Sequence, residues 1–243
     1  MTRSKLHRLI RKWHRYLGLF LGIQLLLWTI GGLYFSWTNI DQVRGDDVRK
    51  KESSLNLEQC TTSLQDVLSR LNASSKVEHL MAVQLVNVLD SSYYQITFHN
   101  GERTASVLAN AATGALRQPL SEKEAIEVAK AGISKDAPME KVEYLTEVGA
   151  HHEYRENPLP AYAISFGGEV NATVYVSTEK GTIQKIRNNR WRVFDFLWML
   201  HTMDYEGRDD INNWILRIFS LLGLVALLSG FALYWVSRKR KVS

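Results

Sequence analysis

Two long apolar runs lie near the two ends of the chain. Residues 16–37 contain no charged residue, and residues 214–236 contain only one, Arg217. As helices that rise 1.5 Å per residue, the two runs extend about 33 Å and about 35 Å, enough to cross the hydrocarbon core of a bilayer. No small-residue cleavage site follows the first run, so we expect an uncleaved helix rather than a signal peptide. The pattern therefore predicts two transmembrane helices.

Between the two runs, apolar and polar residues alternate with the period of a β-strand. Residues 94–98 and 106–110 form one pair of such segments, and residues 162–166 and 173–177 form a second pair. Glycines lie at the turn of each pair and again just after it. Alternation broken by glycine is typical of antiparallel hairpins. We therefore expect two similar small sheets.

A helical pattern precedes each pair of strands. Residues 57–71 carry leucine and valine at helical spacing, and Ser121 with Glu124 three residues later is typical of a helix N-terminus. A third segment follows each pair at its second glycine, at residues 113–116 and 180–183, so the order of one helix and three strands occurs twice, about 68 residues apart from Tyr94 to Tyr162. This spacing predicts the duplication of a small α+β module.

Charge is distributed unevenly along the 243 residues. Residues 1–15 carry six Lys or Arg, residues 236–243 carry four, and neither tail has an acidic residue. The rest has 20 basic against 25 acidic residues, so the formal net charge of +5 belongs to the tails. Basic flanks of apolar helices favour the cytoplasmic side. We expect both termini in the cytoplasm, the middle of the chain outside it, and no nucleic-acid partner.

The first apolar helix carries a candidate metal ligand. His14, Gly18 and Gly22 recur every four residues and therefore share one helix face. Small residues let a second helix or a flat molecule approach the backbone, and haem is a flat cofactor whose iron a histidine can bind. No CxxCH motif occurs and Cys60 is the only cysteine, so any haem is bound noncovalently. The alternative is that His14 is one more polar residue in a basic interfacial cluster.

Other polar residues offer candidate chemistry. His201 lies in the aromatic segment 190–205, and Arg217 either pairs with a haem propionate or extends to the membrane surface. The loop His151-His152-Glu153 either meets a metal ion or is solvated. Four acidic residues near the second run either attract Fe³⁺ or only make the turns soluble: Asp195, Asp204, Asp209 and Asp210.

Short motifs at this point resemble a known family. Residues 11–18, Arg-Lys-Trp-His-Arg-Tyr-Leu-Gly, resemble the first-helix signature of PepSY-associated transmembrane proteins. Leu200-His201-Thr202 and residues 229–235 resemble a second segment of that family. Residues 119–187 resemble a PepSY domain, and residues 55–117 resemble a degenerate copy of it.

The resemblance divides the chain into eight segments and gives the fold class. We expect an α+β membrane protein, in which two transmembrane helices flank a periplasmic domain of two tandem PepSY-like repeats, each a helix plus an antiparallel sheet. The segments are a cytoplasmic basic tail (1–15), the first transmembrane helix (16–37), a linker (38–54), the degenerate repeat (55–118), the PepSY domain (119–189), a periplasmic interfacial aromatic segment (190–213), the second transmembrane helix (214–236) and a second cytoplasmic basic tail (237–243).

The resemblance also implies a function. The chain is similar to the small two-helix ferric reductases of the bacterial inner membrane, which carry b-type haem and support iron uptake. This implies that His14 and His201 bind haem and that ferric iron or a ferric siderophore is reduced in the periplasm. Arg217, Gly18 and Gly22 become cofactor-binding residues on the same basis. The activity is electron transfer, so we expect no catalytic acid, base or nucleophile.

Geometry constrains how haem is held. We expect His14 at the inner and His201 at the outer end of a span of about 33 Å, so the two cannot ligate one iron. A parallel homodimer solves this, because each histidine then meets its copy and the dimer holds two haems; whether His7 takes part is open. No glycine-rich dinucleotide motif occurs, so quinol or a separate cytoplasmic reductase supplies the electrons.

Two other functions remain open. In the first, the chain is a membrane-anchored PepSY module that binds or inhibits a periplasmic protease or an envelope sensor. In the second, it is a haem-free accessory subunit of an iron transporter. In both, His14 and His201 are incidental and the glycines only pack helices.

Overall fold

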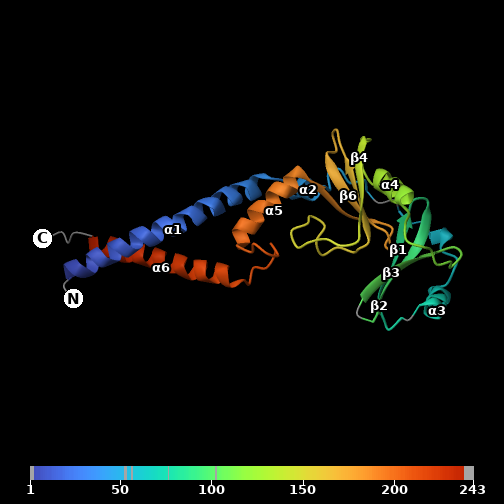
Figure 1. The fold of residues 1–243 in the computed structure, drawn as a ribbon, viewed down its shortest axis with the longest axis horizontal. Helices are drawn as coiled ribbons and strands as arrows, with labels where there is room; N and C mark the ends of the chain where they lie inside the picture. Colours follow the sequence, from blue (N-terminus) through green and yellow to red (C-terminus); the bar gives the residue numbers. More distant parts are fainter. Residues whose placement is uncertain (1–2, 52–53, 56, 76, 102, 238–243) are drawn as a thin grey trace. The chain divides into compact units, whose positions relative to one another are not determined.

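The computed structural model describes residues 3–51, 54–55, 57–75, 77–101 and 103–237 (Figure 1). Contacts divide the chain into two compact units, which we name the helical unit (residues 1–39 and 193–243) and the α/β unit (residues 40–192). The basic residues Arg238 to Lys241 of the second tail lie outside the described residues. Each unit is considered by itself below.

Two long helices dominate the helical unit. Helix α1 (Arg3–Trp37) joins the basic N-terminal segment to the first apolar run without a break, and α6 (Trp214–Ser237) contains the second run. Both are long and apolar enough to cross a membrane, over Arg8–Trp37 and Trp214–Trp235. The two predicted spans are therefore both present as continuous helices.

Helices α1 and α6 lie side by side and antiparallel (Figure 1). The ring of Phe20 is 5.3 Å from that of Phe219, while His14 contacts Ser229 farther along. Because Phe219 pairs with Phe20, α6 begins beside the middle of the first apolar run. The apolar runs of the two helices are thus staggered.

A third helix packs against the C-terminal half of α1. Helix α5 (Asn189–Thr202) places the ring of Phe194 4.7 Å from that of Phe35 and brings Leu197 close to Gly31. The side chains of Gln24 and Trp28 both donate hydrogen bonds to the carbonyl oxygen of Leu200, at 2.9 Å and 3.2 Å. Residues 193–202, expected to lie at the membrane interface, therefore form a helix held against the first span.

The first half of the α/β unit is a helix followed by a three-stranded sheet. A short helix α2 (Ile40–Arg44) and one 3-10 turn, η1 (Leu57–Gln59), precede α3 (Leu64–Ser74). The antiparallel sheet has the order β1-β2-β3, formed by β1 (His79–Val88), β2 (Ser91–Asn100) and β3 (Arg103–Asn110).

The second half repeats this order with one more strand. Helix α4 (Glu122–Ala131) begins at the predicted N-cap, where Ser121 and Glu124 form a reciprocal capping box. The sheet has the order β4-β5-β6-β7, formed by β4 (Met139–Leu145), β5 (Ala161–Phe166), β6 (Ala172–Ser177) and β7 (Ile183–Asn188).

The two halves share a core. Val88 and Leu108 of the first sheet belong to the same buried cluster as Ile164 and Val174 of the second. A side chain at Gly181 would collide with Leu108 and Val88, so this glycine, at a φ of +67°, both makes the turn and lets the sheets meet.

Three features of this unit differ from the sequence pattern. Strands β1 and β4 were not anticipated, because β1 contains a bulge at Leu80/Ala82 that breaks the period of two and β4 is a largely exposed edge strand. The first helix starts at Leu64, after the N-cap Ser63, and not at residue 57. The expected linker includes α2, whose Val43 is buried against the domain.

Candidate functional site

His14 is held on α6 by two neighbouring residues. Its Nδ1 atom lies 2.7 Å from the hydroxyl oxygen of Ser229, and the hydroxyl of Ser229 donates to the carbonyl oxygen of Ala226, also at 2.7 Å. A Cβ atom added at Gly230 would lie 3.3 Å from Cε1 of His14, so the absence of a side chain there lets the imidazole lie close to the helix. The ring of His14 is thereby fixed in position and orientation.

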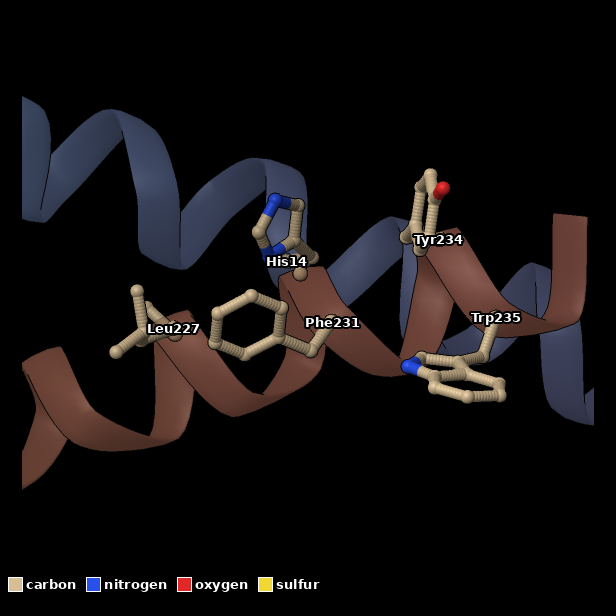
Figure 2. Close-up of a pocket in the computed structure, with 7 residues that line it drawn as sticks. His14, Leu227, Phe231, Tyr234 and Trp235 are labelled. Carbon is tan, nitrogen blue, oxygen red and sulfur yellow. The ribbon is translucent and has the colours of Figure 1, made fainter. Parts of the chain in front are cut away.

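An apolar pocket opens beside His14. Its volume is about 650 Å³, within the range of small-molecule sites. Figure 2 shows His14 on α1 beside Phe231 and Tyr234 of the last turns of α6, with Trp235 on the other side of the same helix. The lining residues other than His14 all belong to α6: Ala226, Leu227, Gly230, Phe231, Tyr234 and Trp235.

His201 lies among aromatic rings at the end of α5. Its ring is 5.5 Å from that of Trp28, 6.0 Å from that of Trp198 and nearly parallel to the latter. Phe35 meets the same imidazole edge-on at 6.2 Å. The side chain of His201 is nevertheless exposed, so it is oriented by its neighbours and accessible from outside the chain.

The two histidines lie at different depths along α1. The ring of His201 lies between those of Trp28 and Phe35, which follow His14 by 14 and 21 residues, about 21 Å and about 32 Å along the axis. The sequence had suggested about 33 Å, with His201 at the outer end of the span. The bonds from Gln24 and Trp28 to Leu200 hold the backbone before His201 beside the middle of the apolar run, and its ring extends from there toward Phe35. The two side chains are still too far apart to bind one metal ion.

Gly18, Gly22 and Arg217 do not take part in the contact between α1 and α6. A Cβ atom added at Gly18 or Gly22 would meet nothing within 4 Å, so α6 does not pack on these two glycines, although it contacts His14, which was expected to share their face. Arg217 is exposed in the first turn of α6, two residues before Phe219. All three are therefore available to a ligand or to another chain. The side chain of His7 lies outside the described residues.

The acidic residues near the second run are mostly used in the fold. Asp195 is buried and pairs with Arg208. Asp204 is also buried and accepts hydrogen bonds from the backbone of Glu206, Gly207 and Asp210. Burial alone would raise the pKa of Asp204, but these backbone donors outweigh it and hold the pKa below its ordinary value. Asp195 and Asp204 thus stabilise the turn and do not form an open site for Fe³⁺.

The histidine loop is part of a structural network. Glu153 accepts hydrogen bonds from Arg192 through both carboxylate oxygens and from the hydroxyl of Tyr175. Nδ1 of His152 accepts the backbone N–H of Tyr154. Burial raises the pKa of Tyr154 and that of Tyr175, so both stay neutral. Within the described residues, no group of three or more His, Cys, Asp or Glu is placed to hold a metal ion.

Three residues that shape the histidine sites were not recognised as partners in the sequence. Ser229 is 215 residues from His14, and Gln24 and Trp28 are 176 and 172 residues from Leu200. Gln24 is the only amide in the run of residues 16–37, and such an amide is a sequence signal for a hydrogen bond between helices, without indicating its partner.

Two membrane-spanning candidates joined to a mixed α+β domain define a membrane-anchored protein. In a comparison with protein families, residues 11–243 match the PepSY-associated TM region, so the chain belongs to this family. No curated protein and no solved structure matches the chain.

Proposed function

We propose that the protein is an inner-membrane electron-transfer protein that binds b-type haem and reduces ferric iron, free or bound to a siderophore, on the periplasmic side in support of iron uptake. The observation that carries the proposal is the pair of accessible, pre-oriented histidines in the helical unit. His14 faces an apolar pocket, and His201 is exposed among aromatic rings about 21–32 Å farther along α1, between Trp28 and Phe35.

The residues present fit noncovalent haem. A haem site needs an imidazole with a free nitrogen and apolar side chains around it, and His14 with the α6 side chains supplies both on one side of the pocket. Bound haem supplies a one-electron redox centre. His14 and His201 would each bind the iron at one site, and the exposed guanidinium of Arg217 would be available to pair with a propionate.

Each site has one well-placed histidine, so a second copy of the chain supplies the other ligand. Gly18 and Gly22 are not covered by α6, which allows a haem or a second helix to lie against these two residues. A parallel homodimer brings each histidine to its copy and holds two haems. Two tandem PepSY-like repeats form the domain between the spans in this proposal.

The direction of electron flow follows from the charges of the chain. The basic residues that precede the first span favour a cytoplasmic N-terminus, so His14 lies on the inner side and His201 on the outer side. Electrons enter at His14 from quinol or from a cytoplasmic reductase, and ferric iron is the substrate reduced near His201.

The visible spectrum of the detergent-purified protein tests the proposal. We expect sharp b-type bands after dithionite, a reduced haem content in the His14→Ala and His201→Ala variants, and additive loss in the double variant. His79→Ala, which removes an exposed histidine of the α/β unit, is the matched control and keeps the full haem content. A colourless protein from haem-replete cells, or full haem content in the double variant, overturns the proposal.

A second measurement tests the activity. The haem-loaded protein, reduced and mixed with a ferric chelate, is expected to return to the oxidised spectrum as ferrous iron appears. His201→Ala is expected to slow this step more than His14→Ala when each is compared at equal haem content. Oxidation at an unchanged rate in both variants contradicts the assignment of the outer site.

A further inference from the structure

We propose that Ser229 is a positioning residue that fixes the tautomer of His14. In this assignment Nδ1 carries the proton and Nε2 carries the free lone pair. What that lone pair binds rests on the proposed function, but the tautomer itself follows from the hydrogen bonds of the chain alone.

The argument counts the hydrogens of the Ser229 hydroxyl. A serine hydroxyl has one hydrogen to donate and two lone pairs that accept. Ser229 gives its hydrogen to the carbonyl oxygen of Ala226, because at 2.7 Å two oxygens without a hydrogen between them would repel. The equally short contact with Nδ1 of His14 is then a bond in which Nδ1–H donates and the serine oxygen accepts.

This arrangement is the one that a metal-binding histidine requires. Histidines that bind metals donate their other ring N–H to an acceptor, which fixes the ring and makes the ligating nitrogen more basic. Nε2 of His14 is the nitrogen that Ser229 does not engage. Gly230 leaves room for the ring, because a Cβ atom at this position would lie only 3.3 Å from Cε1 of His14. Ser229 therefore orients the imidazole and Gly230 provides the space for it.

Nitrogen NMR on the full-length chain tests the tautomer without haem. The protein is labelled with ¹⁵N-histidine, produced without haem, and examined in detergent at a pH where the imidazole is neutral. The signals of His14 are identified among those of the seven histidines as the ones that disappear in His14→Gln. We expect a protonated Nδ1 and an unprotonated Nε2 for His14 in the wild type, and a shift toward protonated Nε2 in Ser229→Ala. A protonated Nε2 in the wild type overturns the inference, as does an unchanged spectrum in Ser229→Ala.

Matched variants separate positioning from general damage to α6. Ser220→Ala removes an exposed serine of the same helix and is expected to leave the His14 signals unchanged. Ser229→Thr keeps the hydroxyl and is expected to restore the wild-type tautomer. Gly230→Ala is expected to move the ring signals of His14, whereas Gly223→Ala, where a Cβ meets nothing within 4 Å, is not. Equal effects of Ser220→Ala and Ser229→Ala contradict the inference.

A second readout separates this inference from the proposed function. In the haem-loaded protein, Ser229→Ala is expected to lower haem affinity about 10- to 100-fold and to shift the reduction potential to a more positive value, because a less basic imidazole stabilises ferric iron less. If Ser229→Ala alters the tautomer of His14 but the wild type binds no haem, the positioning role of Ser229 stands and the proposed function is wrong. If haem binding depends on His14 but Ser229→Ala leaves the haem affinity and the reduction potential unchanged, the proposed function stands and the positioning role of Ser229 is wrong.

Discussion

The side-chain amide of Gln24 on α1 donates a hydrogen bond of 2.9 Å to the carbonyl oxygen of Leu200 in the last turn of α5. Carbonyls in the last turn of a helix have no partner within the helix, and one buried in an apolar environment is costly to leave unpaired. Gln24 and Trp28 satisfy this carbonyl together. They thereby fix the depth at which the next residue, His201, lies along the first span.

Gln24→Leu is expected to destabilise the helical unit by about 1 kcal/mol, the usual net value of one hydrogen bond between helices. Trp28 still donates to the same carbonyl, so the loss is moderate, and the double variant with Trp28→Phe is expected to lose more. Thermal unfolding in detergent measures the effect. Thr29→Val is the control, because its hydroxyl bonds only within α1, to the carbonyl oxygen of Leu25. An effect of Thr29→Val equal to that of Gln24→Leu contradicts the assignment.

Asp195→Asn is expected to cost about 3 kcal/mol, because it leaves Arg208 partly buried without its charged partner. The side chain of Asp195 is only 5% exposed, so water replaces little of the lost interaction. The exposed pair of Lys135 and Glu169 provides the comparison, and Glu169→Gln is expected to change the stability much less than Asp195→Asn, because water screens this pair. Unfolding free energies of the two variants, measured in the same detergent, check the difference. Equal costs would mean that burial does not strengthen the pair.

Asp204 predicts a pH dependence of stability. Its pKa is lower in the folded protein than the ordinary value of 3.8, so the folded state favours the ionised carboxylate. The stabilisation by Asp204 is therefore complete above the ordinary pKa and is lost as the pH falls through the lowered pKa. The difference in stability between the wild type and Asp204→Asn is expected to be constant near neutral pH and to shrink in acid. Asp136→Asn, which removes an exposed carboxylate of the same residue type, is the control for the loss of one negative charge.

Features set by neighbouring residues were predictable from the sequence. The two long helices follow from uninterrupted apolar runs, and α4 begins where Ser121 and Glu124 predict. The hairpin from β2 to β3 turns at Gly101, one of the glycines that marked the turns, because a left-handed backbone there requires no side chain. In each case the determining contacts lie within a few residues.

Features set by distant residues were not predictable. The packing of α5 on α1 depends on bonds between residues more than 170 positions apart, and no local pattern encodes them. Asp195 could be read from the sequence as a solvent-exposed acidic residue, but it is buried and paired with Arg208. No local pattern indicates this ion pair either. The histidines of the site were recognisable by type and position, whereas the hydroxyl that orients His14 was not, because Ser229 looked like one more small residue in an apolar helix.

Gly18 and Gly22, which α6 does not cover, predict where a haem or a second copy of the chain binds. Alanine at either position meets nothing within 4 Å and favours the helix by about 0.5–1 kcal/mol, so Gly18→Ala and Gly22→Ala are expected to leave the contact between α1 and α6 intact.

Leucine at the same positions fills the space that a haem or a second helix needs. Gly18→Leu and Gly22→Leu are therefore expected to lower haem content and the fraction of dimer, measured by absorbance and by light scattering in detergent. Ile23→Phe, which enlarges an exposed apolar side chain of the same helix, serves as the control and is expected to change neither. Full haem content and an unchanged oligomeric state in both leucine variants would mean that this face of α1 meets only lipid.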